Sequence, residues 1–310
     1  MNKKQVAKYL IIVFILAYAI EILASVYAVK NPDVIGKTVF QISAMVLMFT
    51  PFFGTLITKG NFKGIGFKPK FKGCAYLLPL CFFGPAIIAS LGAALFYFIF
   101  PDMFDLTGSY LQSTLPEGMN FLEELEKKGV SYSMYIVIVI FQCITYAPIF
   151  NMFIALGEEV GWRGFLYPEL EKSFGKIGSW IIGGIIWGAF HFPMMIIAGY
   201  EYGTDYPGFP FVGIIVFTVF CISLGIIHEI VYDKSKCIWY PALLHGAVNA
   251  CTFTLMFYNV NNPERASKLM ILGPAFNAAI GGIPALVVAV VLAMVTLSKK
   301  KKNAEVQNGN

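Results

Sequence analysis

The sequence predicts an all-α, polytopic membrane protein of about eight transmembrane helices, with both termini in the cytoplasm. Of the 310 residues, 57% are hydrophobic and only 13% are charged, and the apolar residues occur in long continuous runs. A soluble domain carries about 25% charged residues, so this chain has too little charge to cover a water-facing surface. Continuous runs favour helices, because the strands of a membrane barrel alternate in polarity.

Eight apolar runs are each long enough to cross a bilayer, which takes about 20 helical residues. In chain order they are residues 9–29, 39–58, 74–100, 134–156, 178–198, 211–230, 238–258 and 270–298. Residues 121–128, between the third and fourth runs, are predicted to form a short solvated helix on the outer face. Residues 299–310 are expected to form a polar, unstructured cytoplasmic tail.

Lysine and arginine predict the orientation of these spans. Seventeen of the 23 basic residues fall on the side of the eight-span arrangement that also holds both chain ends. Basic residues are enriched in cytoplasmic segments, so both termini are predicted to be cytoplasmic, and an even number of spans agrees with this.

Ionisable side chains at membrane depth are costly, so each one is a candidate functional residue. Near the end of the fourth run, Glu159 and Arg163 are spaced i,i+4 and are predicted to pair on one helix face. Glu158 is turned away from Glu159 by ~100°, and is expected to lack the arginine and to be free to act as a general base. A salt bridge that only marks a helix end is the alternative.

Two of the three histidines lie inside predicted spans. His191 follows Trp187 by one helical turn, and Asn249 follows His245 by one turn, so each pair shares a helix face. Gly184 and Gly188 form a small-xxx-small pair that allows another helix to approach closely.

Two further ionisable sites are interpreted as structural. Glu21, late in the first run, has no motif around it. His228 and Glu229 are interpreted as the polar interfacial end of the sixth run, because the second histidine of the zinc-binding pattern H-E-x-x-H is missing. The chain also lacks the G-x-S-x-G string of a serine nucleophile and an intramembrane pair of aspartates.

The polar residues of the later spans, in this order, resemble the motifs of the CPBP intramembrane proteases, which include type II CAAX prenyl endopeptidases and the Abi proteins of bacteriocin processing and immunity. The motif residues are Glu158, Glu159, Arg163, His191, His245 and Asn249. Trp187 stands where the family usually has phenylalanine, so an aromatic ring is kept. On this resemblance, residues 1–310 form a single membrane domain with a catalytic core at about 134–258.

The resemblance implies hydrolysis of peptide bonds within the membrane. Glu158 and His191 would hold and activate the attacking water, and His245 and Asn249 would stabilise the oxyanion. Glu159 and Arg163 would support the site, with Trp187 beside them.

The same residues are compatible with a metal site and with a metal-free site. Glu158, His191 and His245 would form a three-ligand site for a divalent metal such as zinc, as in a metalloprotease. A metal-free mechanism with glutamate as the base uses the same residues. Asn249 favours the metal-free form, because an amide is a poor zinc ligand and a good donor to an oxyanion.

Two other functions remain as alternatives: a transporter or channel with a buried His/Glu relay, and a non-catalytic immunity or partner protein of the same fold. The expected partners are the lipid bilayer and a peptide or protein substrate, such as a prenylated tail or a leader peptide, and no nucleic acid. The expected location is multi-pass in a bacterial cell membrane.

Overall fold

The structure, a computed structural model, describes residues 1–115 and 118–308, with side chains described as far as residue 299. Every regular element within these ranges is a helix, which confirms the all-α prediction. Five of the helical segments described there are long and apolar enough to cross a membrane. They are Lys3–Lys30, Val34–Lys59, Leu77–Ile99, Ala147–Ala198 and Phe211–Ser235. The chain is therefore a helical integral membrane protein, while the number of eight spans and the cytoplasmic location of the termini stay predictions.

The first three predicted spans become four helices. Helix α1 (Lys3–Lys30) and helix α4 (Leu77–Ile99) lie where the sequence places them. The second predicted span is divided into α2 (Val34–Leu47) and α3 (Thr50–Lys59). Pro51 has no N–H to donate to the carbonyl of Leu47, and the Thr50 hydroxyl donates to that carbonyl instead, at 2.9 Å.

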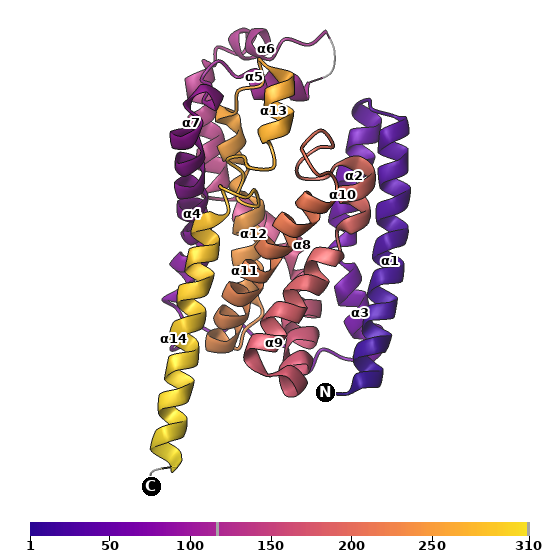
Figure 1. The fold of residues 1–310 in the computed structure, drawn as a ribbon, viewed down its shortest axis with the longest axis vertical. Helices are drawn as coiled ribbons and strands as arrows, with labels where there is room; N and C mark the ends of the chain where they lie inside the picture. Colours follow the sequence, from indigo (N-terminus) through magenta and orange to yellow (C-terminus); the bar gives the residue numbers. More distant parts are fainter. Residues whose placement is uncertain (116–117, 309–310) are drawn as a thin grey trace.

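The segment after α4 forms short helices. They are the 3₁₀ helix η1 (Pro101–Met103), α5 (Ser109–Thr114) and α6 (Phe121–Lys127). Helix α6 confirms the predicted short helix, and the Asn120 side chain caps it by accepting from the first backbone N–H groups. Figure 1 shows α5, α6 and α13 (Pro263–Leu269) at the end of the molecule opposite to both termini.

Prolines also divide the next two predicted spans. The fourth becomes α7 (Tyr132–Cys143) and α8 (Ala147–Gly161), with Pro148 in the first turn of α8. The fifth becomes α9 (Tyr167–Ala189), which is kinked at Gly175, and the short α10 (Phe192–Ala198). Together with the second span, three of the predicted continuous spans are therefore broken helices, because a proline cannot continue the hydrogen-bond ladder of the preceding turn.

The last third of the chain has two long helices and one shorter helix. They are α11 (Phe211–Ser235), α12 (Trp239–Asn249), which runs into the 3₁₀ helix η3 (Cys251–Phe257), and α14 (Ile283–Asn308). The predicted eighth span began too early, because residues 270–282 form turns. The predicted unstructured tail is helical as far as Asn308, residues 309–310 lie outside the described residues, and the side chains from residue 300 onward are not described.

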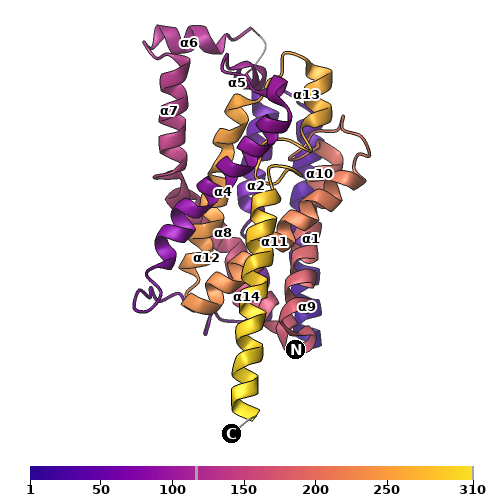
Figure 2. The same ribbon diagram turned by 60° about the vertical axis from the view of Figure 1, so that its left-hand side comes forward.

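Helices α8, α9, α11 and α12 form the centre of the bundle. Figures 1 and 2 show them between α1, α2 and α3 on one side and α4, α7 and α14 on the other. Within the centre, α8 packs most extensively on α12, and α9 packs on α11. The predicted glycine pair lies in this second contact: a Cβ on Gly184 would lie 2.5 Å from the Cα of Ile222, and one on Gly188 would lie 2.9 Å from the Thr218 hydroxyl.

The contact of α8 with α12 depends on Gly246, which follows His245. A Cβ there would lie 2.4 Å from the backbone nitrogen of Met152 and 2.6 Å from the carbonyl oxygen of Pro148. These neighbours are backbone atoms and cannot move aside as a side chain would, so only glycine allows the two helices to lie this close.

Replacing Gly246 with alanine is therefore expected to destabilise the protein by about 1–3 kcal/mol and to lower its melting temperature in detergent. Gly84→Ala in α4 is the control, because nothing lies within 4 Å of the added methyl group. Equal melting temperatures for the two variants would contradict the proposed close packing.

Candidate functional site

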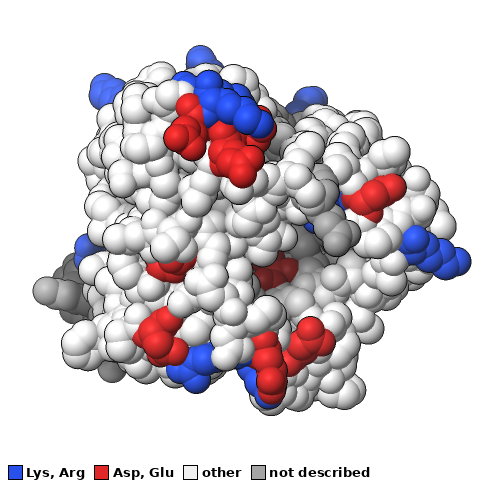
Figure 3. Space-filling model, turned by 90° about the horizontal axis from the view of Figure 1, so that it is seen from above, with Lys and Arg blue, Asp and Glu red and all other residues white. Residues whose placement is uncertain are grey.

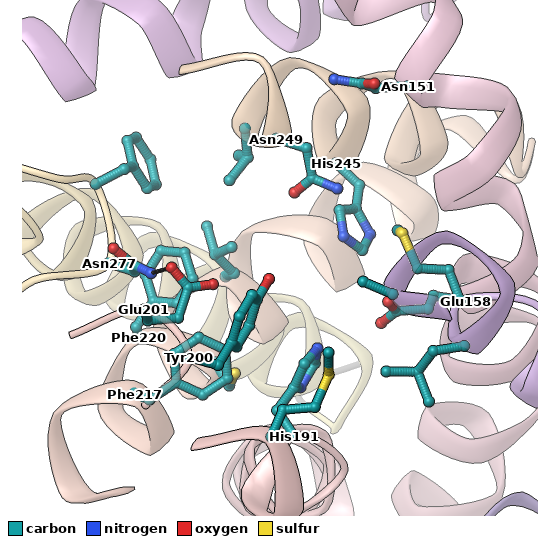
Figure 4. A pocket seen from close by; sticks show the side chains of 18 of the residues that line it. Asn151, Glu158, His191, Tyr200, Glu201, Phe217, Phe220, His245, Asn249 and Asn277 are labelled. Atoms are coloured by element: carbon teal, nitrogen blue, oxygen red, sulfur yellow. Dashed lines mark hydrogen bonds between the residues drawn. The ribbon is translucent and has the colours of Figure 1, made fainter. Parts of the chain in front are cut away.

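The residues singled out in the sequence surround one cavity between the central helices. Its volume is about 620 Å³, and Figure 4 shows it from close by. Its lining includes the four candidate catalytic residues Glu158 of α8, His191 between α9 and α10, and His245 and Asn249 of α12. In Figure 4, the side chains of Glu158, His191 and His245 point toward one another, and Asn249 lies beside His245. The sequence-based grouping of these residues is thus matched by their arrangement in space.

Glu158 is held by two tryptophans. Its Oε2 accepts from Nε1 of Trp162 at 2.8 Å and from Nε1 of Trp187 at 2.6 Å. The expectation that Glu158 is free was wrong in this respect, although it does lack an arginine partner. Two N–H donors on one oxygen fix the orientation of the carboxylate. The carboxyl group still faces the cavity and can accept a proton from a molecule bound there.

Glu159 lies behind the cavity and joins Arg163 to His245. The predicted ion pair is present, with 3.0 Å between Glu159 Oε1 and Arg163 Nη1, and both side chains are fully buried. The same Oε1 lies 2.8 Å from Nδ1 of His245. Because a carboxylate can only accept, Nδ1 carries the hydrogen, and Nε2 of the neutral ring is an acceptor. The guanidinium also lies over the rings of Trp187 and Tyr167, at 4.4 Å and 4.9 Å from their centroids.

A π-helical turn carries two of these contacts. It spans Trp162–Leu166 and follows α8 directly. Trp162 and Arg163, its first two residues, donate to Glu158 and Glu159, each four positions earlier in the chain. Such turns are rare and occur often at functional sites. Here the turn supplies the partners of both glutamates from one short segment.

Helix α1 holds both ends of the turn that carries His191. Pro193 has no N–H for the carbonyl of Ala189, and the Tyr18 hydroxyl donates to this carbonyl at 2.9 Å. Glu21, nearly one turn further along α1, accepts at 3.4 Å from the backbone N–H that follows Pro193. Glu21 is fully buried, and these contacts agree with the structural role predicted for it.

His191 lies at the break between α9 and α10 instead of within a continuous span. Its Nδ1 is 3.1 Å from the carbonyl oxygen of Trp187, which can only accept, so Nδ1 donates and Nε2 is an acceptor. The ring stacks on Tyr200 with a centroid distance of 6.3 Å, and its edge meets Phe217 at 5.1 Å. These neighbours fix the ring at the cavity wall.

His228 is a site residue that the sequence analysis misassigned. It was interpreted as an interfacial residue, but its side chain is fully buried and packs against the rings of Trp187 and His245, at 5.8 Å and 5.7 Å. Its neighbour Glu229 is also buried and pairs with Lys176 of α9 at 3.2 Å. The signal that could have identified His228 was the scarcity of histidine: the chain has three, and His228 packs against His245, which lines the cavity with His191.

The donor atoms that converge at this site differ from the predicted metal ligands. Those of Glu159, His228 and His245 lie within 4.8 Å of one another, whereas the predicted set of Glu158, His191 and His245 does not meet this distance in the described part of the chain. Arg163 already neutralises Glu159, so a divalent cation on the converging set would lie beside a fixed positive charge. The converging donors therefore do not fit a metal.

The fold and the site define a class: a helical integral membrane protein with a buried cavity lined by a glutamate, two histidines and an asparagine. Comparison with known proteins narrows this class. Residues 131–251 match the family model described as "Type II CAAX prenyl endopeptidase Rce1-like". The matched segment includes all the predicted site residues.

A curated relative is also similar to part of the chain. The chain is similar to "CAAX prenyl protease 2" of Methanococcus maripaludis, with 28% identity over 90 residues. The aligned part is 29% of this chain and 30% of the archaeal protein, so the match spans less than a third of either protein.

Proposed function

We propose that the protein is an intramembrane endopeptidase that hydrolyses peptide bonds of membrane-associated peptides or proteins. The observation that carries this proposal is the cavity in which Glu158, His191, His245 and Asn249 meet, within the Rce1-like segment. A carboxylate and an imidazole that both accept hydrogen bonds lie opposite an amide that donates them. Hydrolysis needs both: a base beside water and donors directed at the developing negative charge.

In the proposed reaction, a water molecule donates one hydrogen to Glu158 and the other to Nε2 of His191. Glu158 takes a proton as the water oxygen attacks the carbonyl carbon of the scissile bond. The carbonyl oxygen becomes an oxyanion, which accepts from the Asn249 amide. The proton on Glu158 then passes to the leaving nitrogen as the C–N bond breaks, which releases a carboxylic acid, still carrying the second hydrogen of the water, and an amine, and restores the base.

His245 contributes to this step only in its protonated form. Its Nδ1 is committed to Glu159, so Nε2 can donate to the oxyanion only when the ring is an imidazolium. In that form the ring faces the Glu159 carboxylate at Nδ1, 2.8 Å away. We therefore propose that Glu159 and Arg163 act through His245, by fixing its orientation and supporting its charge.

The proposed substrate class rests on the similarity to CAAX prenyl proteases. We propose a prenylated C-terminal tail or a leader peptide as substrate, bound from the lipid bilayer, and a mechanism that needs no metal. The bacterial cell membrane stays the predicted location.

The test uses the full-length chain in liposomes with two peptides, one farnesylated near its C-terminus and one leader-type peptide. In H₂¹⁸O, at least one of them is expected to be cut at a single bond, with ¹⁸O in the new carboxyl group. His191→Ala is expected to lower the rate by roughly 10²-fold or more, and a chelator is expected to leave it unchanged. Glu126→Gln on α6 is the control, because Glu126 is exposed.

Three outcomes would contradict parts of this proposal. A folded parental protein that cuts neither peptide would support a non-catalytic partner protein. Proton flux that depends on His191 without cleavage would support the relay alternative. Loss of cleavage on adding the chelator would overturn the metal-free mechanism.

A further inference from the structure

A second carboxylate lines the same cavity at the side away from Glu158. It belongs to Glu201, in the loop between α10 and α11. Figure 4 shows Glu201 and Asn277 across the cavity from Glu158 and His245. Figure 3, which views the face opposite the termini, shows a hollow near the middle of that face with acidic atoms in it. The cavity is therefore acidic at two places, and the reaction proposed above uses only one of them.

Glu201 is held in place by neutral groups. Its Oε2 accepts from Nδ2 of Asn277 at 2.5 Å, and the Tyr202 hydroxyl donates to the backbone carbonyl of Asn277 at 2.6 Å. The backbone of Glu201 has a φ of 75°, a left-handed conformation that costs a non-glycine residue about 1 kcal/mol or more. The loop is thus tied to the segment before α14, and the carboxylate is held at the cavity wall.

Glu201 has no counter-cation among the residues that the structure describes. The ion pairs formed by the described residues do not include it. Burial raises the pKa of Glu201, whereas hydrogen bonds from Asn277 and Tyr200 oppose that rise. The charge of Glu201, with burial second, raises the pKa of the Tyr200 hydroxyl, which keeps it protonated as a donor. Glu201 is a half-buried carboxylate with donors but without a cation among the described residues; such a charge is normally paired when it is removed from water.

Aromatic rings connect this site to the proposed reaction centre. Tyr200, next to Glu201 in the chain, stacks on His191. Phe217 contacts His191 and lies 5.8 Å from Phe220, and both phenylalanines line the cavity with Tyr200. Aromatic faces next to a carboxylate favour a cation, because each ring face attracts positive charge.

We infer that Glu201, with Asn277 and the surrounding rings, forms a subsite for a cationic group of the substrate, namely a lysine or arginine side chain close to the scissile bond. This inference rests on the proposed peptidase function and adds a preference in sequence to it. The cation completes the charge site of Glu201 and holds the chain across the cavity, so that the scissile carbonyl lies between Glu158 and Asn249.

The test measures binding and cleavage separately. Farnesylated peptides carry lysine, arginine, citrulline or norleucine at each position near the modified cysteine in turn. Binding is measured with full-length Glu158→Gln protein, in which turnover is blocked, and cleavage with the parental protein. At one position, the cationic peptides are expected to bind roughly tenfold more tightly than the norleucine peptide, as a charge-assisted hydrogen bond predicts.

Adding Glu201→Gln is expected to abolish this preference without changing the melting temperature, because the amide keeps the size of the side chain and a carbonyl that can accept from Asn277. Asp205→Asn is the matched control, since it removes a negative charge from the same loop at an exposed position outside the cavity lining, and it is expected to keep the preference. The lysine and arginine arms show which cation is preferred, and citrulline separates charge from shape.

Each outcome decides the inference. Equal binding of all peptides, no binding of any, or a preference that survives Glu201→Gln overturns the subsite. A preference lost with Glu201→Gln supports it. If cationic peptides are preferred but the parental protein cuts no peptide, the subsite is supported and the peptidase function is contradicted. If peptides are cut without a preference for a cation, the peptidase function is supported and the subsite is contradicted.

Discussion

Replacing Glu158 with glutamine is expected to lower the rate of peptide cleavage by roughly 10²- to 10⁴-fold, while the protein keeps its fold. Glutamine has the same length, and its carbonyl oxygen can still accept from Trp162 and Trp187, which bind one carboxylate oxygen at 2.8 Å and 2.6 Å. The packing around residue 158 is therefore retained. The amide cannot take a proton from water at neutral pH, so the variant loses the base and little else.

The measurement is kcat and KM for the same peptide, together with a melting curve in detergent. The loss is expected in kcat, because the base acts in the transition state. Trp187→Phe is the comparison: it keeps a ring but removes one N–H donor, and roughly a tenfold loss is expected. A Glu158→Gln protein that melts like the parent and retains its kcat would exclude Glu158 as the base.

The contacts within the site were predictable from the sequence where the two residues are close together in the chain. The i,i+4 spacing of Glu159 and Arg163 was enough to predict their ion pair, because the helix continues through both residues. The pairing of Gly184 and Gly188 with another helix was predictable for the same reason. The resemblance to a family then placed His191 and His245 at the same site, which local spacing alone does not do.

Contacts between distant segments were not predictable. Trp187 reaches Glu158 across 29 positions of sequence, and no single-sequence pattern marks that contact. The sequence around His228 resembles the polar end of a membrane helix, so His228 was predicted to be interfacial. In the fold, α11 packs on α9, and the side chain of His228 is buried. Hydropathy also cannot detect the break before Pro193, since both sides of it are apolar, yet this break places His191 in a turn.

Replacing Arg163 with methionine is expected to destabilise the protein by about 3–5 kcal/mol, the cost of leaving a buried charge without its partner. Both members of the pair are fully buried, so water cannot solvate the Glu159 carboxylate once the guanidinium is gone. The exposed pair of Arg265 with Asp102 gives the control: its two contacts of 2.7 Å and 3.1 Å are similar in form, but solvent screens them. Arg265→Met should therefore change stability little. The free energy of unfolding of both variants is measured by titration with a denaturing detergent.

The double variant Glu159→Gln/Arg163→Met separates stability from activity. Removing both charges removes the uncompensated carboxylate, so most of the lost stability is expected to return. Cleavage is expected to stay low, because Nδ1 of His245 then faces a neutral amide, and its imidazolium form loses the carboxylate that supports it. Recovery of both properties would show that the pair serves packing only. Recovery of stability alone would show that the two residues act on the reaction through His245, which is the reason to keep a costly buried ion pair next to the cavity.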